Sequence, residues 1–262
     1  MLTYVQLHRP KTLAEAYDQL TKNRMSLLLG GGCWLRLSNW AWMSAIDLSG
    51  LDLKYIKEEE SYFAIGAMST QGDVERYSAF STFANGVLVR SVQAILGAQF
   101  RNVATFGASV AARYGFSDII PTLLALDAKV KMYKKGIIPL EEYLKISERD
   151  ILLEVQIPKK ENKIAVETHR KLQTDFPFLT GSMSFNEDGY HIYIGARPAP
   201  AVQAHRAGAL LTEKGLEAIE EVIELVLEEV TFQTNSHASE EYRRALVPGM
   251  VRRMAKEIAA WK

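Results

Sequence analysis

The sequence has a single cysteine, Cys33, among its 262 residues. An intramolecular disulfide is therefore impossible, and the chain cannot supply the several thiolates of a zinc–thiolate site or an iron–sulfur cluster. Its five histidines include no pair with H-E-x-x-H spacing, so no metal site is expected. If the protein belongs to an iron–sulfur electron path, the clusters must lie on a partner.

The sequence also lacks an excess of charge of either sign. Lysine plus arginine is 31 and aspartate plus glutamate is 31, whereas proteins that bind nucleic acid usually carry a basic excess. No apolar run reaches the ~18 residues of a membrane span, and residues 1–10 hold no apolar signal-peptide segment. We therefore expect no nucleic-acid partner, no membrane span and a cytoplasmic location.

Enough apolar residues are present to build a substantial core, because the hydrophobic fraction is 48%. Helical spacing predicts helices, and alternating or short apolar runs predict strands. The predicted helices are 11–20, 70–77, 82–97, 119–129, 215–230 and 240–261, and the predicted strands are 26–29, 45–48, 62–67, 129–133, 151–157, 164–172, 181–185 and 191–196. The polar segment 158–163 separates a mixed first part from a second part of antiparallel strands and two helices. The predicted domains are 1–160, with subdomains of about 1–55 and 56–160, and 164–262; the predicted fold class is α+β.

The strand at 26–29 runs directly into three glycines, Gly30, Gly31 and Gly32. Glycines let the backbone turn sharply, and successive free amides in such a turn form an anion-binding nest. The segment is not a P-loop, because no G-K-S/T follows, and it lacks the spaced third glycine of a Rossmann loop. Taken alone, it fits a structural turn as well as a phosphate-binding one.

A second segment of small residues, 101–112, precedes an acidic residue, Asp118. Taken alone, its small residues fit close packing. Together with the glycine segment it predicts a dinucleotide site, in which backbone amides bind a diphosphate and a carboxylate binds ribose hydroxyls.

Five stretches match, in order, the motifs of a known family. Residues 28–35 resemble its A-G-G-[TSH]-x-L loop, 65–70 resemble I-G-A-x-T-T, and 101–109 resemble R-N-x-x-T-I-G-G-N. Residues 117–128 match S-D-x-x-P-x-L-L-A-L-D-A almost residue for residue, and 241–244 match E-Y-R-R. The family is that of the FAD-binding (medium) subunits of molybdenum hydroxylases such as xanthine dehydrogenase.

The resemblance implies a two-subdomain FAD-binding fold of the vanillyl-alcohol-oxidase type, followed by a smaller α+β domain. Residues 28–35 would wrap the FAD diphosphate, 105–109 would face it, and Asp118 would bind ribose. No side chain is assigned a catalytic role. The positions assigned to the cofactor are Leu28, Leu29, Gly30, Gly31, Gly32, Cys33, Trp34, Leu35, Ile95, Thr105, Phe106, Gly107, Ala108, Ser109, Asp118, Leu152 and Lys171, of which Ile95, Leu152 and Lys171 would lie near the flavin.

The implied function is electron transfer within a heteromeric oxidoreductase. Electrons would come from a molybdopterin-binding large subunit through a 2Fe–2S small subunit to FAD on this chain, and leave to NAD or another acceptor. A xanthine or purine dehydrogenase is the favoured type. The alternatives are the nicotinate, aldehyde, carbon monoxide and hydroxybenzoyl-CoA types, or a degenerate module that binds no flavin.

Several residues depart from the family pattern. Cys33 and Trp34 replace a small polar pair, and bulky Tyr114 and Phe116 stand where small residues are usual. The two rings would stack on the flavin, cover it or occlude its site. Cys33 is interpreted as a small buried residue, with a redox role as the alternative. A basic group on the last helix is expected to form a solvated face: Arg243, Arg244, Arg252 and Arg253.

Overall fold

The computed structural model describes residues 1–261 and divides the chain into two compact units. The first unit is formed by residues 1–77, 97–112 and 128–159, and the second by residues 78–96, 113–127 and 160–262. Each unit is thus assembled from segments that are distant in the sequence. The α+β fold class is confirmed.

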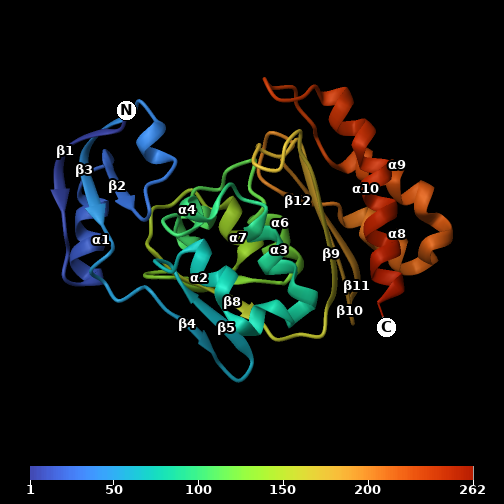
Figure 1. Ribbon diagram of the computed structural model, residues 1–262, viewed down its shortest axis with the longest axis horizontal. Helices are drawn as coiled ribbons and strands as arrows, with labels where there is room; N and C mark the ends of the chain where they lie inside the picture. The colour runs from blue at the N-terminus through green and yellow to red at the C-terminus, as the bar shows by residue number, and fades with distance from the viewer. Residues whose placement is uncertain (262) are drawn as a thin grey trace. The chain divides into compact units, whose positions relative to one another are not determined.

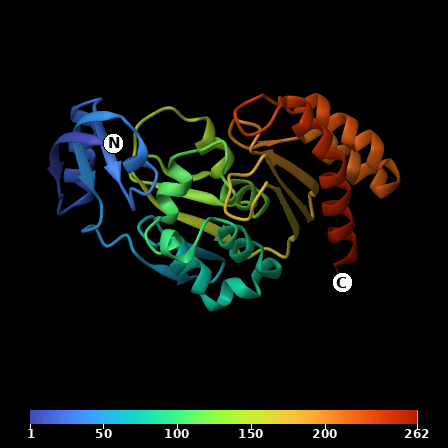
Figure 2. The same cartoon turned by 45° about the horizontal axis from the view of Figure 1, so that its top comes forward.

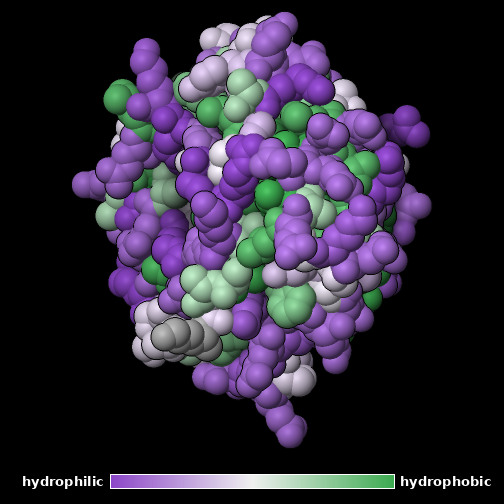
Figure 3. All heavy atoms as spheres, turned by 90° about the vertical axis from the view of Figure 1, so that its right-hand side faces the viewer, coloured by the Kyte–Doolittle hydropathy of each residue, from purple (hydrophilic) through white to green (hydrophobic). Residues whose placement is uncertain are grey.

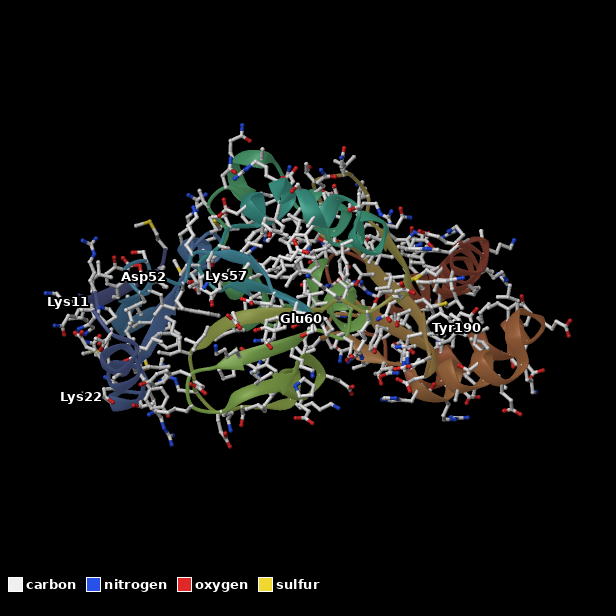
Figure 4. All side chains as sticks on the ribbon, turned by 90° about the horizontal axis from the view of Figure 1, so that it is seen from below. Lys11, Lys22, Asp52, Lys57, Glu60 and Tyr190 are labelled. Atoms are coloured by element: carbon white, nitrogen blue, oxygen red, sulfur yellow. The ribbon has the colours of Figure 1, made fainter. Side chains whose placement is uncertain are left out.

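The first unit contains a three-stranded parallel sheet in the order β1 (Thr3–His8), β3 (Ala41–Asp47), β2 (Ser26–Leu29). Helix α1 (Leu13–Lys22) packs against it, since its apolar residues recur on one face and pack with buried Ile46. Thr12 Oγ1 accepts a hydrogen bond from the Glu15 amide and caps the helix. In Figure 4 the label Lys22 marks the last residue of α1, and the label Lys11 marks the chain just before the Thr12 cap. The helix predicted at 11–20 and the strand predicted at 26–29 are both present.

A second sheet of the first unit is antiparallel throughout. Its order is β4 (Ile56–Glu58), β5 (Tyr62–Gly66), β8 (Leu152–Pro158), β6 (Lys129–Met132), β7 (Gly136–Pro139). Short helices complete the unit: the 3₁₀ turn η1 (Leu35–Leu37), α2 (Gln71–Arg76), α4 (Ala98–Arg101), α5 (Phe106–Ala111) and α7 (Leu140–Lys145).

The core of the second unit is a four-stranded antiparallel sheet. Its order is β12 (Val202–Gln203), β11 (Gly189–Gly195), β10 (Leu179–Asn186), β9 (Lys163–His169). Helices α8 (His205–Lys214), α9 (Ile219–Glu229) and α10 (Glu240–Ala260), with the turn η4 (Gly215–Ala218), cover one face of this sheet (Figures 1 and 2). The other face meets α6 (Ile119–Ala125), which packs with α3 (Val87–Gln93). Helix α3 in turn contacts the turns η2 (Ser78–Ser81) and η3 (Phe83–Gly86).

Strand β10 is buried on both faces because helices lie on each side of it. Gly181 lies against Met250 of α10, where a Cβ atom would come within 2.4 Å of the methionine sulfur. On the opposite face Ser182 Oγ donates a hydrogen bond of 2.6 Å to the Pro121 carbonyl of α6. The outward side of the covering helices is mostly hydrophilic (Figure 3), as expected of amphipathic helices.

The helix predicted at 82–97 is wrong in its bounds. Ala84 and Asn85 have φ of 45° and 56°, and Gly86 has φ of 69°, so the backbone leaves the helical region before α3 begins at Val87. The helix predicted at 119–129 ends at Ala125, and Asp127 has φ of 55°. Positive φ ends a right-handed helix, since the N–H and C=O groups no longer align along the axis.

Candidate functional site

The glycine segment follows β2 and lies directly against residues 103–108 of the first unit. The Gly31 amide donates to Thr105 Oγ1 at 3.4 Å. A Cβ atom on Gly30 would come within 2.4 Å of Thr105 Oγ1, and one on Gly31 within 1.9 Å of the Val103 carbonyl oxygen. Only glycine therefore allows this approach, and the two segments singled out in the sequence meet in the fold.

The turn leaves backbone donors available. Among residues 1–261, no group accepts a hydrogen bond from the amides of Gly30 or Gly32, whereas the Cys33 amide contacts its own thiol. Gly32 has φ of 67°, and a Cβ atom there would meet nothing within 4 Å. Free amides around a left-handed glycine form the concave donor set that binds phosphate oxygens.

Cys33 itself is half-buried, and burial raises the pKa of its thiol, although Arg36 opposes this effect. Its Sγ lies 3.8 Å from the Gly31 carbonyl oxygen, which is a weak contact. A thiol with a raised pKa holds little thiolate at neutral pH, so the geometry favours the small-residue interpretation.

The second segment is anchored by a third stretch, residues 67–71. The Phe106 amide donates to Ser69 O at 2.7 Å and the Gly107 amide to Ala67 O at 3.0 Å. A Cβ atom on Gly107 would come within 2.6 Å of the Ala67 Cα, so glycine is again required for the approach. These bonds fix the start of α5, and α5 packs on β8, which carries buried Leu152.

Gln71 is a residue that the sequence argument missed. It is 3% exposed, its Nε2 donates to Ser109 Oγ at 2.9 Å, and Ser109 Oγ in turn donates to Thr105 O at 2.9 Å. Gln71 Oε1 is buried, and among the described residues no group donates to it. The sequence signal that could have identified Gln71 is its position directly after the 65–70 motif.

Trp34 packs against Phe100 in the first unit, with ring centroids 5.4 Å apart and planes inclined at 54°. This contact joins the end of the glycine segment to α4.

Three of the assigned residues belong to the second unit: Ile95, Asp118 and Lys171. Asp118 is 8% exposed, and Arg170 Nη2 donates to its Oδ1. Burial raises the pKa of Asp118 to about 6, and the Arg170 charge and hydrogen bond oppose the rise. Ile95 is half-buried and Lys171 is exposed, so the Lys171 ammonium is accessible.

The bulky residues Tyr114 and Phe116 stack on each other, with centroids 4.8 Å apart and planes at 11°. Phe116 also contacts Phe176, at 4.4 Å between centroids. The rings thus form part of an aromatic cluster within the second unit. That these rings stack on the flavin, cover it or occlude its site stays a prediction.

The prediction of a solvated basic face is wrong for Arg243, because its side chain is only 1% exposed. Its guanidinium donates to the carbonyl oxygens of Phe178, Ala196, Gln233 and Ala238 and to Asn235 Oδ1. It is a buried structural arginine, because the chain folds back so that five acceptors surround it.

Among residues 1–261, no group of three or more histidine, cysteine, aspartate or glutamate side chains is placed to hold a metal ion. In the same residues no helix combines the length and the apolar character needed to cross a membrane.

Comparison with known families identifies both parts of the chain. The model of the FAD binding domain in molybdopterin dehydrogenase matches residues 3–160, and the model of the CO dehydrogenase flavoprotein C-terminal domain matches residues 169–258.

Three similar proteins illustrate the range of relatives. The xanthine dehydrogenase FAD-binding subunit of Escherichia coli O157:H7 is 23% identical over 286 residues, which cover 99% of this chain and 98% of that protein. The uncharacterized protein YgfM of Escherichia coli K12 is 25% identical over 162 residues, which cover 62% of this chain and 61%, less than two thirds, of YgfM. The carbon monoxide dehydrogenase from Hydrogenophaga pseudoflava shares the fold, with a TM-score of 0.89, 21% identity and 97% of each chain covered.

The first of the two family models spans more than half of the 262 residues. The chain therefore belongs to the family of FAD-binding domains of molybdopterin dehydrogenases.

Proposed function

We propose that this chain is the electron-transfer flavoprotein subunit of a xanthine- or purine-dehydrogenase-like molybdenum hydroxylase. The observation that carries the proposal is the glycine turn at Gly30–Gly32 with its free amides. In this proposal a molybdopterin-binding subunit oxidises the substrate, a 2Fe–2S subunit relays the electrons, and NAD or another acceptor receives them from this subunit.

The residues of the first unit fit the diphosphate of FAD. Contacts of 2.4 and 1.9 Å with the 103–108 segment exclude side chains at Gly30 and Gly31, so these two positions offer a ligand only backbone groups. The amides of Gly30 and Gly32 are assigned to the phosphate oxygens. Thr105 keeps the turn in place through its bond from the Gly31 amide.

The remaining assignments follow the resemblance residue by residue. Asp118 is assigned to ribose hydroxyls, and Ile95 and Leu152 to apolar contact with the flavin. Lys171 is assigned to offset negative charge near the flavin ring, which its exposed ammonium supports. When bound, FAD supplies the redox chemistry, and the protein supplies binding and electrostatic tuning.

The partner proposal rests on the cysteine content. One cysteine cannot ligate an iron–sulfur cluster, so the clusters of such an electron path must come from other subunits. The choice of a xanthine dehydrogenase type is supported by the relative that this chain matches over almost its whole length.

A carbon monoxide dehydrogenase type is the second candidate, because residues 169–258 match the flavoprotein domain of that enzyme. The test is to purify the chain with the proteins encoded beside it, and to measure FAD content and flavin bleaching under xanthine, hypoxanthine or carbon monoxide. Bleaching by a purine supports the first candidate, and bleaching by carbon monoxide supports the second. A colourless chain that takes up no added FAD would overturn both and favour a module without flavin.

A further inference from the structure

Arg170 joins three separate segments of the second unit through one guanidinium. Its Nη1 donates to the Ala94 carbonyl at 2.9 Å and to the Asp175 carbonyl at 3.0 Å. Its Nη2 donates to Asp118 Oδ1. The side chains of Arg170 and Asp118 are 12% and 7% exposed, so the pair is largely shielded from water.

Each of the three segments borders a position assigned to the cofactor. Ala94 precedes Ile95, Asp118 is itself the assigned ribose ligand, and Asp175 ends the short stretch that begins at Lys171. Arg170 was assigned no role by the sequence argument.

Asp118 stands at the start of α6 but does not cap that helix. No side-chain cap bond is made by Asp118, and the Ile120 amide donates to Ser117 Oγ at 3.1 Å instead. Since Ser117 takes over the capping role, the carboxylate is free to face Arg170.

Only one of the two Asp118 carboxylate oxygens has a hydrogen-bond partner among the described residues. Arg170 donates to Oδ1, and among the described residues no group donates to Oδ2. The Asp118 side chain is 7% exposed, so a small part of it still contacts solvent. A carboxylate fixed at one oxygen and open at the other suits an acceptor for hydroxyl groups.

We propose that Arg170 is the positioning residue for Asp118: it holds Oδ1, so that Oδ2 accepts hydrogen bonds from the ribose hydroxyls of the dinucleotide. The same guanidinium ties the end of α3 and the 171–175 stretch to that carboxylate. This proposal rests on FAD binding as proposed above. Arginine suits the role because its planar fork serves several acceptors at once, whereas lysine offers the charge without the fork.

A charged group near Asp118 other than Arg170 would also change the ionisation of its carboxyl group. Among residues 1–261, Arg170 is the only charged group that acts on the Asp118 carboxyl. The elements packed on α6, which are α3, β10 and β11, present to it the hydroxyls of Ser91 and Ser182. Burial and Arg170 therefore control the ionisation state of the Asp118 carboxyl group.

The test measures FAD dissociation constants for the full chain, stripped of flavin and retitrated, in wild type, Arg170→Ala, Arg170→Lys, Asp118→Asn and the Arg170→Ala/Asp118→Asn double variant. We expect Arg170→Ala to weaken FAD binding about 10- to 100-fold, as the loss of a charged hydrogen bond does. Arg170→Lys should recover part of the affinity. The double variant should bind FAD no more weakly than Asp118→Asn, because Arg170 acts only through Asp118.

The pH dependence separates positioning from a purely structural role. FAD affinity should rise as Asp118 ionises, and the midpoint should move to higher pH in Arg170→Ala, stay near the wild-type value in Arg170→Lys and vanish in Asp118→Asn. Arg252→Ala is the matched control, since it removes a surface arginine of the same unit that pairs with Glu220.

The outcomes are distinct. If wild type binds FAD and folded Arg170→Ala binds it equally well, the role of Arg170 is overturned and the proposed function stands. If Arg170→Ala lowers the melting temperature but leaves the FAD affinity and its pH midpoint unchanged, Arg170 is structural only. If wild type itself binds no FAD, the proposed function fails and the ribose role fails with it.

Discussion

Gly31→Ala is the sharpest perturbation of the glycine turn. The new Cβ atom would lie 1.9 Å from the Val103 carbonyl oxygen, 2.8 Å from its carbonyl carbon and 3.1 Å from Ala104 Cα. Real Cβ contacts essentially never fall below 3.0 Å, so the turn must move by at least about 1.1 Å away from the 103–108 segment. The nearest atoms are backbone, and no side chain can rotate away to make room.

This displacement has two separate costs. Overpacking of this kind destabilises a protein by about 1–3 kcal/mol, and each kcal/mol lowers the melting temperature by about 2–4 °C in a chain of this size. The same shift breaks the bond from the Gly31 amide to Thr105 Oγ1 and misplaces the neighbouring amides. Loss of one charged hydrogen bond to a phosphate raises the FAD dissociation constant about 10- to 100-fold.

The assay is flavin fluorescence titration of the stripped protein, together with thermal melting without FAD. Gly50→Ala is the matched control, because its Cβ atom would meet only the Pro10 carbonyl oxygen at 3.9 Å and its φ is not positive. We expect Gly50→Ala to bind FAD like wild type. If Gly31→Ala also binds FAD with wild-type affinity, then the turn does not hold the diphosphate and the reasoning is refuted.

Three further predictions concern other parts of the chain. Arg243→Ala should lower the free energy of unfolding in urea by about 3–5 kcal/mol, because it leaves buried carbonyl oxygens without a hydrogen-bond donor. Arg252→Ala, which removes an exposed side chain, should lower it by at most about 1 kcal/mol. Equal losses in the two variants would contradict the buried role of Arg243. Burial raises the pKa of Asp118 from 3.8 to about 6, so the ionised form is the disfavoured one in the folded chain. The stability of flavin-free wild type relative to Asp118→Asn should therefore be highest below about pH 4 and fall by about 3 kcal/mol as the pH rises through about 6, and a flat difference across that range would refute the burial argument. Cys33 should react with iodoacetamide at neutral pH more slowly than a free cysteine peptide, because burial raises its pKa; reaction at the peptide's rate would restore the redox-thiol alternative.

Local signals predicted much of the first unit. The apolar spacing of α1 and its Thr12 cap act within a few residues, and both are present in the fold. Strand β2 has the predicted bounds, since a short apolar run that ends in glycines has few other conformations. Strand β1 was missed because it lies at the sheet edge with nearly every residue exposed, and so has no alternating pattern.

The candidate site was predictable in its parts but not in its contacts. The glycine turn and the 105–109 segment stand out by composition, because small residues are the ones that allow close backbone approach. That Gly31 meets Val103 and Thr105 depends on chain segments more than 70 residues apart, and no periodicity encodes it. Gln71 and Arg170 carry no special local pattern, and only their hydrogen-bond partners give them a role.

The sequence by itself determined the α+β class, the family and the two segments of glycine and other small residues, 30–32 and 105–109. It also showed that one cysteine cannot carry a cluster, so any iron–sulfur partner must be another chain. Only the tertiary structure decided which polar groups are buried together: Arg243 among carbonyl oxygens, and Asp118 against Arg170. The physical reason is that turns, caps and helical faces arise from neighbours along the chain, whereas burial and ion pairing arise from segments that meet only after the chain has folded back on itself.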